Sequence, residues 1–268
     1  MGPRSPYRVG LFALCAMIFA FLILPIAIIV PLSFNAGEFF SFPLEAVSLR
    51  WYGEVLSNER WGFAARNSLI VGVSTTLFAT ALGTMAALGI DRLQSRLRAI
   101  IVFILISPMV VPLVIVAVAV FFFYARFNLV GTFVGLIMAH TALALPFVVI
   151  TVLAALQGRN PNLPRAAASL GAPPIVAFFT VTLPVILPGV VSGALLAFAT
   201  SFDEIVVTLF LAAPQQTTLP REIFSGIRQS ISPAVTAVAT MLIAVSILLM
   251  GTLELIRRRT ARYQGAAR

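Results

Sequence analysis

The chain has 268 residues, of which 60% are hydrophobic and only 10% are charged, and its mean hydropathy is +1.05. Soluble domains carry about 25% charged residues, so the composition excludes a water-soluble globule and favours a polytopic membrane protein. All 18 basic residues are arginines, and a chain without lysine has no P-loop, whose motif needs a lysine before Ser or Thr. The single cysteine, Cys15, excludes a disulfide framework and a multi-cysteine metal site.

Six apolar runs are long enough to cross about 30 Å of hydrocarbon. Prolines inside several of them indicate kinked helices, which suit a protein that lines a cavity. We therefore expect an all-α membrane protein that forms a single membrane domain over 1–268, because no linker or change in composition divides the chain. The expected transmembrane helices are 9–32, 68–90, 99–124, 132–156, 185–202 and 235–255.

The arginines are unevenly distributed over the segments outside these runs. Twelve lie in the N-terminal segment, the second and fourth connections and the C-terminal tail, where Asp91 and Glu254 are the only acids. The other three connections hold six arginines and seven acids. Because an excess of arginine marks the cytoplasmic side, we expect both termini in the cytoplasm. The net charge of +9 therefore reflects membrane topology rather than nucleic-acid binding.

Small residues recur at every fourth position in two of the runs. Such a helix face lets another backbone approach closely in lipid. We expect these faces to pack within one subunit, and a subunit interface is the alternative. The two faces are Ala79, Gly83 and Ala87, and Gly189, Gly193 and Ala197.

The fourth connection contains about 28 residues, and loops of that length are usually functional. Pro164 favours a helix start, Asn162 is a candidate cap, and Gly171 can adopt the left-handed conformation that ends a helix. A second short helix is expected after Pro173-Pro174 and should end before Pro184. The sequence thus predicts two short helices with an alanine-rich face that suits a groove of another protein.

This stretch resembles the EAA loop of permease subunits of type I, binding-protein-dependent ABC importers. The family pattern is Glu-Ala-Ala, three residues, Gly, nine residues and Ile-x-Leu-Pro, and Ala166, Gly171 and Val181 fit its register. The resemblance implies that 164–184 is a cytoplasmic coupling loop that docks on an ATPase subunit. Arg165 replaces the family glutamate, which suggests a complementary acid on the ATPase. The expected docking residues are Arg165, Ala166, Ala167, Ser169, Gly171, Leu183 and Pro184.

The resemblance extends from about Trp51 to Arg258, and its later part looks most like the C-type permease of spermidine/putrescine importers. It implies the transmembrane domain fold of a type I ABC importer, a place in the bacterial inner membrane, and transport rather than an enzymatic role. The implied partners are a second permease subunit in a heterodimer, two ATPase subunits and an external solute-binding protein, besides membrane lipid. ATP would be bound by the ATPases, and no cofactor, metal or nucleic acid is expected on this chain. The supporting motifs include Asn67-Ser68, Ser107-Pro108, Ala139-His140-Thr141, Ser201-Phe202-Asp203-Glu204 and Ile231-Ser232-Pro233.

Three polar residues are candidates for the solute path. Asp203 and Glu204 would attract a polycation at a pore mouth; alternatively, they are interfacial acids that contact the binding protein or a loop arginine. His140 lies within a span, where polar side chains are often functional, although a hydrogen bond to a neighbouring helix is the interpretation that we expect. Asn67 and Ser68 are expected to cap the second span.

Other classes of function remain as alternatives. An intramembrane serine protease could use Ser192 with His140, but Gly189 lies three residues before the serine rather than two, and a third orienting group is not evident. A secondary transporter should show repeated halves, and no repeat relates 9–124 to 132–255. Within ABC permeases, an opine, a phosphonate or another small cation is an alternative solute.

Overall fold

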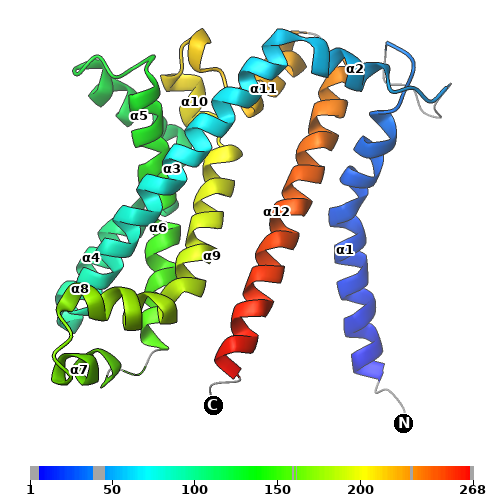
Figure 1. The fold of residues 1–268 in the computed structure, drawn as a ribbon. Helices are drawn as coiled ribbons and strands as arrows, with labels where there is room; N and C mark the ends of the chain where they lie inside the picture. The colour runs from blue at the N-terminus through cyan, green and yellow to red at the C-terminus, as the bar shows by residue number, and fades with distance from the viewer. Residues whose placement is uncertain (1–5, 39–45, 159, 161, 230–231, 266–268) are drawn as a thin grey trace. The chain divides into compact units, whose positions relative to one another are not determined.

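The computed structural model describes residues 6–38, 46–158, 160, 162–229 and 232–265. This part of the chain is helical except for its loops and one isolated antiparallel bridge between Asn35 and Val47 (Figure 1). The all-α fold class is therefore confirmed. Four helices are long and apolar enough to cross a membrane, and a bent pair makes a fifth if it is counted as one span. The expected count of six is thus not reproduced within the described residues.

Where the sequence suggests one continuous domain, the helices group into two compact units. One unit comprises Met1–Gly62 and Ile223–Ile247, and the other comprises Phe63–Glu222 and Leu248–Arg268. Three helices run from one unit into the other: α3 (Glu59–Asp91), α11 (Leu219–Gln229) and α12 (Pro233–Gly265).

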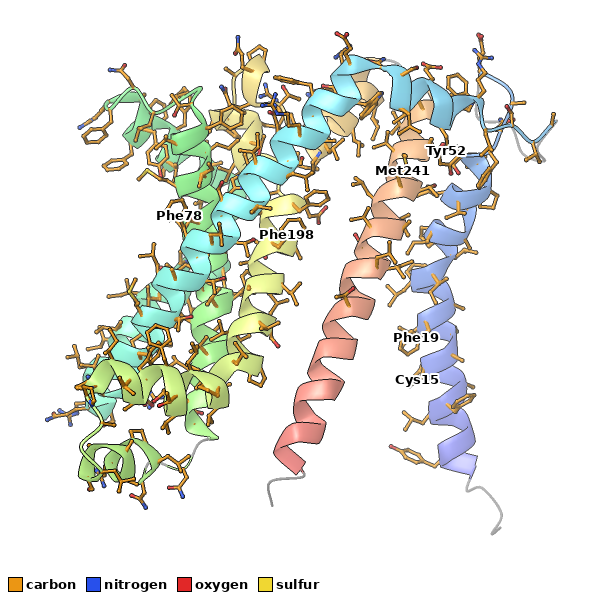
Figure 2. All side chains as sticks on the ribbon, viewed as in Figure 1. Cys15, Phe19, Tyr52, Phe78, Phe198 and Met241 are labelled. Atoms are coloured by element: carbon orange, nitrogen blue, oxygen red, sulfur yellow. The ribbon has the colours of Figure 1, made fainter. Side chains whose placement is uncertain are left out.

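The first unit is built on α1 (Pro6–Leu32) and α2 (Arg50–Ser57). Apolar side chains surround α1, and Cys15 and Phe19 project from it (Figure 2), as expected for a helix surrounded by lipid. Trp51 of α2 is buried and donates a hydrogen bond from Nε1 to the carbonyl oxygen of Asn35, which follows the end of α1, at 2.8 Å. The described apolar stretch of α12 is Pro233–Leu248, which is shorter than the other candidate spans.

In the second unit, α6 lies at the centre and packs most extensively on α9. Val148, Val149 and Val152 of α6 are fully buried in its core. Its first turn is capped by Thr132, whose Oγ1 accepts a hydrogen bond from the backbone N–H of Gly135 at 3.0 Å. The elements of this unit after α3 are α4 (Ser95–Val110), α5 (Leu113–Ala125), α6 (Phe133–Gln157), α7 (Asn162–Ser169), α8 (Pro174–Ala177), the π-helical turn η1 (Phe178–Thr182), α9 (Leu183–Phe202), α10 (Val206–Leu211) and the 3-10 turn η2 (Pro214–Gln216).

Glycines on α3 and α9 bring these helices close to α6. A Cβ atom added to Gly83 would lie 2.8 Å from Val148, and one added to Gly193 would lie 2.5 Å from Oγ1 of Thr151. Both glycines belong to the small-residue faces noted in the sequence, so packing within the subunit is confirmed for these faces. Gly72 of α3 serves the same purpose for Phe198 of α9, whose ring lies 3.1 Å from the position of the missing Cβ (Figure 2).

The expected helix 99–124 is broken rather than merely kinked. Its two parts, α4 and α5, meet at an angle of 102°. Pro112 has no N–H to donate, and its ring disfavours helical geometry at the preceding residue. Val111 is accordingly extended, with φ −72° and ψ 134°. The bend places the ends of α4 and α5 at the edge of the cleft described below.

Candidate functional site

The fourth connection forms a projecting pair of helices, α7 and α8, which we call the knob (162–182). Gly171 has φ +81°, so the left-handed stop predicted for it is confirmed. Its N–H donates to the carbonyl of Ala168 at 3.0 Å, and the N–H of Ala172 donates to that of Ala167 at 3.1 Å. These two bonds are those of a Schellman motif, which turns the chain sharply from α7 towards α8.

Two details of the knob differ from the sequence-based expectation. Asn162 is the first residue of α7 rather than its cap, and its backbone N–H donates to Oδ1 of Asn160 at 3.0 Å. The second short helix does not end before Pro184 but continues through η1 into α9, which gives one helical stretch over Pro174–Phe202. Pro184 directly follows the π-helical turn η1, in which the N–H of Leu183 donates to the carbonyl of Phe178, and such irregular turns accommodate a residue that cannot donate a hydrogen bond.

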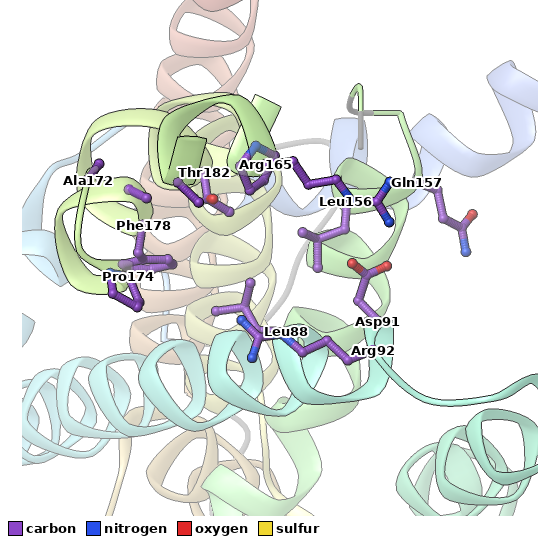
Figure 3. A pocket seen from close by; sticks show the side chains of 13 residues that line it. Leu88, Asp91, Arg92, Leu156, Gln157, Arg165, Ala172, Pro174, Phe178 and Thr182 are labelled. Atoms are coloured by element: carbon purple, nitrogen blue, oxygen red, sulfur yellow. The ribbon is translucent and has the colours of Figure 1, made fainter. Parts of the chain in front are cut away.

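A polar pocket of about 700 Å³ lies between the knob and the ends of α3 and α6 (Figure 3). Arg165 from α7 lines it together with Asp91 and Arg92, which follow one another at the end of α3. The side chain that replaces the family glutamate therefore lies beside this subunit's own helices. Ala166 and Ser169 are exposed on α7, and Leu183 and Pro184 begin α9.

An apolar cleft of about 870 Å³ opens where α4 and α5 are bent. Pro108 and Pro112 line one side, and the end of α9 with its following residues lines the other. Asp203 and Glu204 are the charged residues on its wall. Two adjacent carboxylates at a cleft with otherwise largely apolar walls can attract a cation.

The two acids have different surroundings. Asp203 is exposed, and desolvation in the cleft, followed by repulsion from Glu204, raises its pKa. Glu204 is buried, which alone would raise its pKa. Its hydrogen bond and electrostatic interaction with the His140 imidazole, together with two backbone N–H donors, instead lower the pKa of Glu204 below the usual value.

His140 of α6 joins this corner through both ring nitrogens. Nδ1 lies 2.8 Å from Oγ of Ser201, and Nε2 lies 3.1 Å from Oγ1 of Thr208 and 3.4 Å from Oε2 of Glu204. The structure therefore supports the expected hydrogen bonding between helices. It leaves neither ring nitrogen for Ser192, the nucleophile that a serine protease would need.

Asn67 and Ser68 do not cap the second span, because α3 begins at Glu59, eight residues before Asn67. Asn67 Nδ2 instead donates to the carbonyls of Gln215 at 3.0 Å and Thr217 at 2.9 Å. Oγ of Ser68 accepts a hydrogen bond from the N–H of Leu219 at 2.8 Å. The expectation was wrong because α3 begins with turns that contain charged residues and precede the apolar run. The two side chains instead hydrogen-bond the fifth connection to α3.

The sequence did not identify Thr208 as part of this arrangement. The carboxylate of Glu204 accepts from the backbone N–H groups of Val207 and Thr208, as an N-cap side chain does at the start of α10. Glu204 lies three residues before one of these N–H donors and four before the other. An acid at such a distance before the first turn of a helix is a local signal for capping. The pairing with His140 joins residues far apart in the chain, and no local pattern predicts it.

The packed membrane helices and the projecting helix pair suit a membrane transport subunit. Comparison with known proteins leads to the same class. The model of the family described as "Binding-protein-dependent transport system inner membrane component" matches residues 79–262. The chain belongs to this family and is a multi-pass permease component of the type I ABC importer class. The resemblance seen in the sequence is therefore confirmed.

Two relatives are permeases of Escherichia coli (strain K12). The spermidine/putrescine transport system permease protein PotC is 31% identical over 241 residues, which cover 90% of this chain and 91% of PotC. The putrescine transport system permease protein PotI is 33% identical over 248 residues, with 90% of this chain and 86% of PotI covered. A solved bacterial ABC transporter involved in the import of the acidic polysaccharide alginate has the same fold, with a TM-score of 0.74, 17% identity and coverage of 95% of this chain and 98% of that chain.

Proposed function

We propose that this chain forms half of the translocation path of an ATP-driven importer for a polyamine such as spermidine or putrescine. The observation that carries the choice of solute is the cleft in which Asp203 and Glu204 lie side by side. A polyamine is a flexible chain with several positive charges, and carboxylates at the mouth of a path attract cations. The likeness to PotC and PotI, over about nine-tenths of this chain, supports the same solute class.

The remaining parts of the importer are supplied by other chains in this proposal. A second permease subunit completes the path as a heterodimer, an external binding protein delivers the solute, and two ATPase subunits bind ATP. Closure of the ATPases moves the knob, and because Pro174–Phe202 is one helical stretch, that movement reaches Asp203 directly. The importer then alternates between inward-open and outward-open states.

Uptake of labelled spermidine and putrescine, in cells that lack other importers, tests the solute. We expect uptake with the complete importer, and we expect Asp203→Asn to reduce its maximal rate roughly tenfold, which corresponds to the loss of about 1.4 kcal/mol of charge interaction. Asp203→Glu preserves the charge and should retain most of the rate. Uptake of a phosphonate or an opine in place of both polyamines would favour the alternative solutes, and normal uptake by Asp203→Asn would contradict a cation site.

Co-purification of the ATPase tests the knob as its docking element. Ala166→Trp places a bulky ring on the exposed face of α7 and should abolish retention of the ATPase, because interfaces tolerate little extra volume. Ala125→Trp is the matched control, since Ala125 is also exposed but is the last residue of α5, at the opposite end of the second unit. Equal retention by both variants would reject the docking assignment of the coupling loop.

A further inference from the structure

The corner between α9 and α10 contains a buried polar cluster that joins three helices. His140 comes from α6, Ser201 from the end of α9, and Glu204 and Thr208 from the segment that forms α10. The side chain of His140 is 0% exposed and that of Glu204 is 4% exposed. Buried polar groups of this kind are retained when they are hydrogen-bonded, and each of these four side chains has a hydrogen-bond partner within the subunit.

The carboxylate of Glu204 is fully engaged inside the subunit. Oε1 accepts from the N–H of Val207 at 2.7 Å, and Oε2 accepts from the N–H and the hydroxyl of Thr208, each at 3.0 Å. His140 Nε2 lies 3.4 Å from the same Oε2. A solute could bind this carboxylate only by replacing several of these bonds, and charged hydrogen bonds in a buried site are costly to break.

Asp203 has the opposite surroundings, although it is the adjacent residue. It is exposed on the wall of the cleft, and its backbone N–H ends α9 by donating to the carbonyl of Ala199 at 3.1 Å. The direction in which the Asp203 side chain points therefore depends on the contacts that fix the corner between α9 and α10. Glu204 caps α10, and His140 connects that cap to α6 and, through Ser201, to α9.

We infer that His140 is a positioning residue, which locks Glu204 into the corner between α9 and α10 and thereby presents Asp203, rather than Glu204, to the solute. The inference rests on the proposed function for the identity of the solute. The unequal roles of the two acids, however, follow from the geometry of the cluster. Polyamine recognition on this wall of the cleft thus belongs to Asp203, and the contribution of His140 passes through Asp203.

Single-cysteine labelling tests the lock in the assembled importer. Cys15→Ser removes the one native thiol, and Asp203→Cys and the nearly isosteric Ser201→Cys then report on the cleft wall and on the cluster. A cationic methanethiosulfonate should label Asp203→Cys readily and Ser201→Cys at least about tenfold more slowly, because Ser201 is buried. Adding His140→Ala should accelerate the labelling of Ser201→Cys by about tenfold or more, as expected for the loss of a charged hydrogen bond. His140→Gln keeps a donor near Nε2 and should restore protection.

A double-mutant cycle on spermidine uptake separates positioning from a purely structural role. His140→Ala and Asp203→Asn should each lower the maximal uptake rate, and the double variant should be no slower than Asp203→Asn alone, because coupled residues are not additive. Additive losses would overturn the inference, as would equal labelling of Ser201→Cys and Asp203→Cys in the chain that retains His140. Failure of the proposed function gives a different result: the importer with the native Asp203 does not take up spermidine, while the labelling contrast between Asp203→Cys and Ser201→Cys persists.

Discussion

At the scale of single residues, Gly171 has a left-handed backbone conformation that glycine adopts more readily than other residues. Its φ of +81° costs an L-residue about 1–2 kcal/mol, and the two hydrogen bonds that end α7 depend on it. We predict that Gly171→Ala accelerates hydrogen exchange of the backbone amides at positions 171 and 172 by about fivefold or more. Hydrogen exchange with mass-spectrometric detection on the purified complex measures this change.

The same substitution at Gly89 is the matched control. A Cβ atom added there meets no neighbour within 4 Å, and alanine in a helix is more favourable than glycine by roughly 0.5–1 kcal/mol. Gly89→Ala should therefore leave exchange in the knob unchanged and slow it at the end of α3. If Gly171→Ala left hydrogen exchange in the knob unchanged, the left-handed turn would not determine the local stability of the knob.

At the scale of elements, the seam between α6 and α9 depends on close contact of two backbones. At Gly193, an added Cβ atom would lie 2.5 Å from Oγ1 of Thr151 and 2.9 Å from Cα of Val148. Because a backbone atom cannot rotate away, Gly193→Ala must separate the helices, and overpacking of this kind costs about 1–3 kcal/mol. We predict that the apparent melting temperature of the detergent-solubilised complex falls by several degrees.

Gly251→Ala is the control for this prediction, since Gly251 also lies in a helix but nothing would be within 4 Å of the new Cβ atom. Its melting temperature should equal that of the unsubstituted chain or exceed it slightly. Equal destabilisation by both substitutions would mean that glycine loss itself, rather than the α6–α9 seam, determines the effect.

Local chemistry explains which elements the sequence could predict. The ends of α6 and the final residue of α9 follow from the lengths of apolar runs, and Gly171 follows from the need for a left-handed residue. The consequence of Pro112 could be foreseen only in part. The ring removes a hydrogen bond wherever it occurs, but the resulting bend of 102° depends on how α4 and α5 pack on distant helices.

The candidate site shows the same division between local and distant information. Asp203 and Glu204 were recognisable as a pair of acids at the end of a span. Their unequal roles were not, because they depend on His140, more than 60 residues earlier. The error at Asn67 and Ser68 has a similar cause: their partners lie in the segment 215–219, about 150 residues later. Hydropathy predicts where a span lies but not which segment its polar residues bind.

At the scale of the whole molecule, the orientation in the membrane rests on the arginines. Within the second unit, the knob lies at the same end as Asp91 and Arg92. At the opposite end, Gly131 donates a hydrogen bond to Leu211 at 2.8 Å, which joins the third and fifth connections. The second and fourth connections, which are rich in arginine, thus share one end of this unit, as the rule for cytoplasmic segments requires.

We predict opposite accessibilities for two cysteines introduced into the chain with Cys15→Ser. Arg126→Cys should react with a membrane-impermeant maleimide in intact spheroplasts, and Ser169→Cys should react only in inverted vesicles, both prepared from cells that express this chain without its ATPase. Both native side chains are exposed at the surface of the second unit, so burial within the subunit does not account for a difference. Since ATP is hydrolysed in the cytoplasm, reaction of Ser169→Cys from the outside would separate the knob from any ATPase and reject its role in coupling.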